Sequence, residues 1–230
     1  MSRWKWIVLV VVAVLGLATG GVAWAYPSVA ATACPGCYGL HPTGPGVYME
    51  KGADPSPALA TVSAATQLVE SFYGRRQSSP RVLICTTPSC YKRIGGGREK
   101  GVAVLNQAVM LSPTGLDPVI VAHEMSHVEL HARLSGEVPQ WFDEGLAVVV
   151  SGDARYLKST GDPCLAEPSG PLPETLPDWL RAASADSGTY AKAACQVSRW
   201  LTAHGGRDGV LRLIDRINAG QPFNTAADLG

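Results

Sequence analysis

The sequence has no excess of charge of either sign and no long run of basic residues. Nineteen Lys and Arg residues balance nineteen Asp and Glu residues among 230 positions. Proteins bind nucleic acids largely through clustered cations that contact phosphates, so the sequence gives no electrostatic support for a nucleic-acid partner. Internal repeats and low-complexity tracts are also missing, and the apolar fraction of 46% is that of an ordinary globular protein. One folded domain with a small extension is expected.

Two further patterns are incomplete. The three glycines at 95–97 are not followed by the Lys-Ser pair or the helix start of a phosphate-binding loop, so a turn is expected there. Cys34 and Cys37 form a CPGC sequence, but no second CxxC stands at zinc-ribbon spacing, and Gly and Pro residues follow where a redox motif would open a helix. A structural disulfide is favoured, and a thiol-redox centre is the alternative.

The N-terminus carries the longest apolar stretch. Residues 7–25 are uncharged and follow Arg3 and Lys5, which places the rest of the chain outside the cytoplasm. Aromatic residues at both ends favour a single-pass membrane anchor, whereas the sequence Ala23-Trp24-Ala25 favours a signal peptide that is cleaved and a secreted protein. The predicted organisation is an anchor or signal segment at 1–26, a tether with the CxxC sequence at 27–46 and a domain at 47–230.

Six cysteines in an exported chain indicate disulfides. Proximity along the chain favours the pairs Cys34–Cys37, Cys85–Cys90 and Cys164–Cys195 among the fifteen pairings that six cysteines allow.

Hydrophobic periodicity predicts both helices and strands. Strands are expected at 47–50, 81–86, 102–105 and 108–111, and a free edge of one of the last two strands is a candidate to pair with an extended peptide. Helices are expected at 58–73, from 118 to about 135, from about 139 to about 150, at 189–203 and at 208–217, with Asp117 as N-cap of the second. A loop is expected at 152–177.

The most informative pattern is HExxH at residues 123–127. Positions i and i+4 lie on one face of a helix, so His123 and His127 can point two imidazoles at one metal ion. Glu124 lies beside them, within reach of a water molecule at the metal. The spacing predicts a zinc site with Glu124 as general base.

Glu144 is the best candidate for a third ligand. A short connection brings its helix back against the first, whereas His131 stands too far along the helix axis, since the three histidines span about 12 Å. Asp143 faces about 100° away from Glu144, so it is not expected to be a ligand; Asp143 or Glu137 is instead expected to accept a hydrogen bond from a ligand imidazole. Two histidines and one carboxylate leave a fourth position open, as in catalytic zinc sites.

The segment HEMSH followed by VPQWFDEGLA resembles the gluzincin zinc peptidases, and among them the small peptidase-MA-like domains. The resemblance implies that His123, His127 and Glu144 bind Zn²⁺, that Glu124 is the general base and that Tyr190 supports the oxyanion. It also implies an α+β fold, in which a small mixed sheet packs on the metal-bearing helices and a helical region follows. The third histidine of metzincins and the GxMEN sequence of aminopeptidases are absent.

The resulting hypothesis is a membrane-anchored zinc metallopeptidase that hydrolyses a peptide or protein substrate with metal-activated water. The alternative is a membrane-tethered binding or assembly module that holds zinc without catalysing hydrolysis. The sequence indicates neither the substrate nor the oligomeric state.

Overall fold

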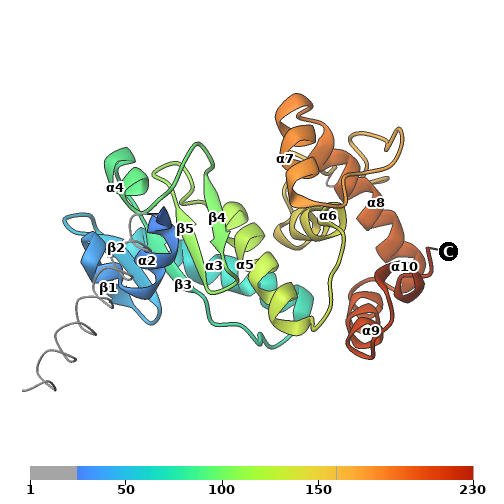
Figure 1. The fold of residues 1–230 in the computed structure, drawn as a ribbon, viewed down its shortest axis with the longest axis horizontal. Helices are drawn as coiled ribbons and strands as arrows, with labels where there is room; N and C mark the ends of the chain where they lie inside the picture. Colours follow the sequence, from blue (N-terminus) through green and yellow to red (C-terminus); the bar gives the residue numbers. More distant parts are fainter. Residues whose placement is uncertain (1–24, 159, 230) are drawn as a thin grey trace, which may run out of the picture.

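The computed structural model describes residues 25–158 and 160–229, and its first half is built on a five-stranded mixed sheet (Figure 1). The strand order is β1-β2-β3-β5-β4, with parallel pairing of β2 with β3 and of β3 with β5 and antiparallel pairing at both edges. The strands are β1 (Leu40–Gly44), β2 (Val47–Glu50), β3 (Arg81–Ile84), β4 (Gly101–Val104) and β5 (Ala108–Leu111). The predicted mixed sheet of an α+β fold is confirmed.

Helices cover both faces of this sheet. Alternate residues of a strand point to opposite faces, and in β3 Val82 and Ile84 enter the main core while Leu83 enters a second, smaller core. The main core lies under α3 (Pro55–Tyr73) and α5 (Pro118–Arg133), and the smaller one lies under α2 (Pro27–Ala33) and α4 (Pro88–Arg93). The second helical layer was not expected from the sequence.

The segment at 27–46, which the sequence suggested to be a tether, is folded onto the domain. It contains α2, the 3-10 helix η1 (Pro35–Tyr38) and β1, which pairs with β2 along the sheet edge. Ala31 and Leu40 are fully buried in the smaller core. Its many Ala, Gly and Pro residues form tight turns and short elements instead of an open linker.

The second half is helical. It consists of α6 (Gln140–Ser151), α7 (Leu176–Ala185), α8 (Thr189–His204), α9 (Arg207–Asn218) and α10 (Phe223–Ala226). In Figure 1, α5 and α6 lie between the sheet on one side and α8 to α10 on the other, and α7 lies above α6. The helix α7 was missed: it begins at Leu176, inside the segment 152–177 that was expected to be a loop, and it buries only Trp179.

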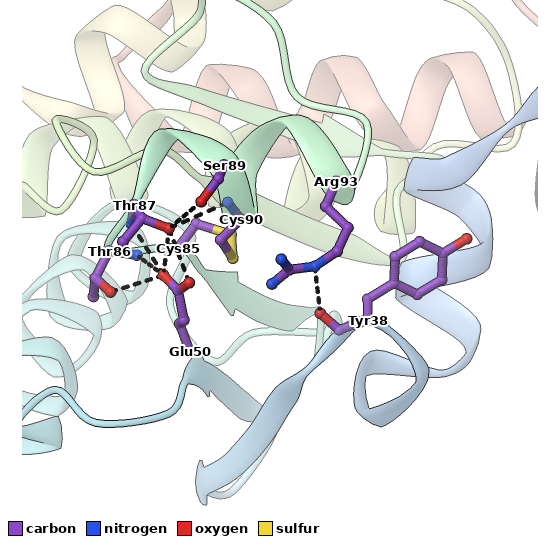
Figure 2. Close-up of a disulfide and its surroundings, with 8 residues drawn as sticks. All are labelled: Tyr38, Glu50, Cys85, Thr86, Thr87, Ser89, Cys90 and Arg93. Atoms are coloured by element: carbon purple, nitrogen blue, oxygen red, sulfur yellow. Dashed lines mark hydrogen bonds between the residues drawn. A yellow bond between two sulfur atoms is a disulfide. The ribbon is translucent and has the colours of Figure 1, made fainter.

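All three predicted disulfides are present: Cys34–Cys37, Cys85–Cys90 and Cys164–Cys195. Figure 2 shows the second of them at the start of α4. There the carboxylate of Glu50, at the end of β2, accepts hydrogen bonds from the backbone and hydroxyl groups of Thr86 and Thr87. The sheet is thereby tied to the short helix that covers it.

The helix α5 begins as predicted, since the side chain of Asp117 accepts a hydrogen bond from the backbone N–H of Val119 and Pro118 is the first helical residue. Its far end is held by Glu129, which is fully buried. The Glu129 carboxylate accepts hydrogen bonds from the backbone N–H groups of Gln77 and Ser78, from the Ser78 hydroxyl and from Arg133. This network fixes α5 against the loop that follows α3.

Of the predicted membrane or signal segment at 1–26, positions 1–24 lie outside the described residues. Within residues 25–158 and 160–229, no helix combines the length and the apolar character that crossing a bilayer requires.

Candidate metal centre

The helices α5 and α6 bring three donor atoms together. His123 Nε2 and His127 Nε2 lie 3.2 Å apart. Glu144 Oε2 lies 3.3 Å from the first of these nitrogens and 3.6 Å from the second. Ligands at ~2.0–2.1 Å from a tetrahedral ion stand about 3.3–3.4 Å from one another. The three donor atoms therefore fit a single metal ion, and the geometry alone does not identify the metal.

Asp143 sets the orientation of His127. Its Oδ1 lies 2.6 Å from His127 Nδ1, which leaves Nε2 directed at the other two donor atoms. The second oxygen of Asp143 lies 2.7 Å from His131 Nε2. Asp143 is thus the hydrogen-bond acceptor for the His127 imidazole, a role that the sequence assigned to either Asp143 or Glu137. His131 contacts Asp143 and not the three donor atoms. A carboxylate of this kind fixes the tautomer of a metal-binding imidazole.

Two neighbours hold Glu144. Gln140, one helical turn earlier, donates a hydrogen bond to Glu144 Oε1 at 3.1 Å. Gly145, the next residue, allows α6 to approach α8 closely, because a Cβ atom placed on it would stand 2.6 Å from the carbonyl oxygen of Ala193. Gln140 was not recognised in the sequence, although its i−4 spacing from Glu144 was a usable signal.

The pKa values of His127 and Glu144 follow from their burial and from the charges around them. Burial alone would lower the pKa of His127, but the charges of Asp143 and Glu144 outweigh it and raise that pKa to about 10. Burial opposes ionisation of Glu144, yet His127 and His123 bring its pKa below the ordinary value. A cation fits such a site, since it replaces the proton that the carboxylates attract.

Glu124 lies beside the donor atoms and reaches toward β4. A Cβ atom on Gly101 would stand 3.0 Å from Glu124 Cγ, so the absence of a side chain at Gly101 allows the strand and the glutamate to come together. Burial raises the pKa of Glu124, and the charges of His123 and His127 oppose that increase only in part. A raised pKa makes a carboxylate a stronger acceptor for the proton of a nearby water molecule.

A cleft of about 250 Å³ opens onto these residues. Its walls come from the segment before β4, from α5, from the loop after α6 and from the start of α8: Glu99, Lys100, Gly101, Ile120, His123, Glu124, Arg155, Tyr156 and Tyr190. We call it the metal-site cleft. The strand β4 forms the outer edge of the sheet beside this cleft. A free strand edge in this position can pair with an extended peptide.

Tyr190 lies in this cleft, with its ring centroid 6.4 Å from that of His123. Its ring stacks on Tyr156 at 5.0 Å and meets Trp179 edge-on at 4.9 Å. Burial and then the charge of Glu144 raise the pKa of the Tyr190 hydroxyl well above its ordinary value, so the hydroxyl keeps its proton. Tyr156 was not expected from the sequence, because it lies in a loop without any periodic pattern.

Cys164, Cys195 and Glu167 also cluster at metal-binding distances. Both thiols are engaged in the Cys164–Cys195 disulfide, so this group is not a metal site.

Of the five residues predicted for the site, His123, Glu124 and Tyr190 line one cleft. His127 and Glu144 do not line it, but they hold their donor atoms next to that of His123, on two helices that pack together. The sequence matches no protein-family model, and neither the curated proteins nor the solved structures give a match.

Proposed function

We propose that the protein is an exported zinc metallopeptidase, anchored to a membrane through residues 7–25. The observation that carries the proposal is the convergence of His123 Nε2, His127 Nε2 and Glu144 Oε2, with His123 and Glu124 lining an open cleft. Two nitrogens and one carboxylate with an open side are the donor set of catalytic zinc sites. With zinc bound, the site would acidify a water molecule and polarise a carbonyl group.

Glu124 is the general base. It takes a proton from the attacking water as the water oxygen bonds to the carbonyl carbon of the peptide. It then returns that proton to the amide nitrogen as the C–N bond breaks, which yields a carboxylic acid and an amine. Tyr190 keeps its proton at neutral pH and donates a hydrogen bond to the oxyanion that forms in between.

The remaining residues position these groups. Asp143 holds the tautomer of His127, and Gln140 orients Glu144. The free edge of β4 offers backbone hydrogen-bonding groups to an extended peptide beside the cleft. An unstructured segment of a protein is therefore the substrate that this arrangement favours.

The substitution Glu124→Gln tests the proposal. The full chain is purified, its zinc content is measured and hydrolysis of unstructured peptides is followed with and without a chelator. Glu124→Gln should keep zinc and lose at least about a hundredfold in turnover, because the base is removed and the donor atoms are not. A matched variant, Glu70→Gln, changes an exposed carboxylate on α3 and should retain full activity.

Unchanged hydrolysis in Glu124→Gln would contradict the assignment of the base. A wild-type chain that holds zinc and cleaves no peptide would instead support the binding or assembly module. The intact carboxylate of Glu124 beside the donor atoms favours the enzyme, since holding a metal does not require it.

A further inference from the structure

The metal-site cleft carries two cations that the proposed chemistry does not use. Lys100 and Arg155 both line it, and both also line a second hollow of about 280 Å³. The two hollows adjoin, because they share these two residues and Ile120. A peptide that lies in the cleft and continues past Ile120 therefore passes between a lysine and an arginine.

Arg155 is held in place. Its guanidinium group donates to both oxygens of Asp153, at 2.8 Å and 3.0 Å from Nε, and it lies over the ring of Tyr156. Asp153 is only 2% exposed, whereas the side chain of Arg155 is 46% exposed. A buried carboxylate and an aromatic ring thus fix an arginine whose remaining N–H groups are open to the cleft. A fixed planar guanidinium binds carboxylates with little loss of conformational entropy.

Lys100 differs from Arg155, since its ammonium group has no carboxylate partner among the residues that the structure describes. The nearby acids are occupied. Glu99 accepts hydrogen bonds from the Tyr91 hydroxyl and from the backbone N–H of Gly97, and Asp117 caps α5. Lys100 therefore presents a positive charge that pairs with no described carboxylate. Arg155 is already paired with Asp153, but its Nη1 group donates to no described residue and is open to a further acceptor.

We infer that a carboxylate group of the substrate binds between Lys100 and Arg155, so that the enzyme prefers peptides with an acidic group close to the bond that is cleaved. The inference rests on the proposed peptidase function and names the substrate class. The carboxylate has two sources, an Asp or Glu side chain inside the peptide or the free C-terminus of the peptide. If the carboxylate is an Asp or Glu side chain, the enzyme is an endopeptidase with acidic specificity. If it is the C-terminus of the peptide, the enzyme is a carboxypeptidase.

Quenched fluorescent peptides of four kinds, built on one common sequence, separate these sources. The first has Glu, the second Gln and the third Lys at a position that is scanned over three residues on each side of the cleaved bond, all with an amidated C-terminus. The fourth is the Gln peptide with a free C-terminus. The full zinc-loaded chain should cleave the Glu peptide or the free-acid peptide with a kcat/KM about tenfold above the amidated Gln peptide, since each exposed ion pair contributes a factor of about two to five. The preference should shrink as salt is added.

Substitutions tie the preference to the two cations. Lys100→Glu should abolish the preference for the acidic peptide and favour the Lys peptide. Arg155→Lys keeps the charge and the ion pair with Asp153 but loses the planar fork, so it should reduce the preference in part. Arg75→Glu makes the same charge change at an exposed position in the loop after α3, outside the cleft lining, and should leave all ratios unchanged.

Binding to the Glu124→Gln variant, measured by anisotropy with labelled peptides, separates the two proposals. Cleavage of all four peptides at equal rates would overturn the carboxylate site and leave the peptidase function standing. Absence of cleavage, together with tighter binding of an acidic peptide that Lys100→Glu removes, would overturn the peptidase function and support the carboxylate site. Neither cleavage nor selective binding would overturn both.

Discussion

Gly145 allows a direct test of how packing holds the metal centre. It follows Glu144 on α6 at the point where α6 meets α8. In Gly145→Ala the new Cβ atom would stand 2.6 Å from the carbonyl oxygen of Ala193 and 2.8 Å from a methyl group of Val197. A methyl group can turn away, but the carbonyl oxygen belongs to the backbone of a helix. The two helices must therefore move apart.

The cost follows from two opposing effects. The Ala193 oxygen would have to withdraw by roughly 0.5–1 Å to reach an ordinary contact distance, and overpacking of a core costs about 1–3 kcal/mol. An alanine in a helix interior stabilises the fold by about 1 kcal/mol relative to a glycine. The net loss is about 0–2 kcal/mol, which lowers Tm by at most roughly 8 °C in a chain of this size. Because Glu144 moves with α6, affinity for zinc should fall as well.

Thermal unfolding followed by circular dichroism measures the first effect, and competition with a chromophoric chelator measures the second. Gly36→Ala is the matched control, since a Cβ atom there meets no other atom within 4 Å. It should leave Tm and zinc affinity near the wild-type values. A Gly145→Ala variant as stable as the wild type, with unchanged zinc affinity, would refute the claim that close approach of α6 and α8 positions Glu144.

Three further predictions concern other parts of the fold. Asp143→Asn should weaken zinc binding by about 10–100-fold, because the carboxylate no longer orients His127; chelator competition measures it. Glu129→Gln should cost about 3 kcal/mol in urea unfolding, because a buried charged network is broken. Burial opposes ionisation of Glu129, but hydrogen bonds from the loop after α3 outweigh it and lower the pKa. The stability it contributes is therefore complete above the ordinary glutamate pKa and lost as the pH falls through the lower folded-state value. Leu105→Asn should raise stability by about 1 kcal/mol, because Leu105 is exposed at a φ of 48°, where asparagine is less strained; thermal unfolding measures it.

Each of these three has a control. Asp215→Asn alters an exposed carboxylate on α9 and should not affect zinc binding. Glu70→Gln alters an exposed carboxylate and should keep the wild-type acid dependence that Glu129→Gln loses. Leu180→Asn replaces another exposed leucine, on a regular helix, and should not stabilise the protein. A control variant that changes the measured property more than its test variant does would contradict the role given to the test residue.

The sequence predicts the elements that have strong local signals. The helix that carries His123 and His127 has an N-cap, a first-turn proline and an apolar face, and its start is confirmed at Pro118. The three disulfides were predicted from closeness along the chain, and each joins residues that the fold brings together. The pairing of two imidazoles with Glu144 follows from helix periodicity and a short connection.

What the sequence does not reveal depends on contacts between distant segments. Tyr156 and Arg155 lie in a loop, and only the folded chain brings that loop against Tyr190. The segment at 27–46 was interpreted as a tether because Gly and Pro dominate it, yet β2 supplies the partner strand that orders it. The hydrogen bonds of Asp143 to two histidines likewise require both helices to be placed.

The disulfide between Cys164 and Cys195 makes assembly of the cleft dependent on oxidation. It joins the loop after α6, which carries Tyr156, to α8, which carries Tyr190. Closing a loop of this length stabilises a fold by on the order of 3–4 kcal/mol. In a reducing compartment that contribution is absent, and the loop that carries Tyr156 loses its covalent link to α8. The helices α5 and α6, which carry the donor atoms, remain joined by the short connection between them. For the peptidase proposed above, a cleft that reaches its full stability only after oxidation would limit hydrolysis of proteins in a reducing compartment.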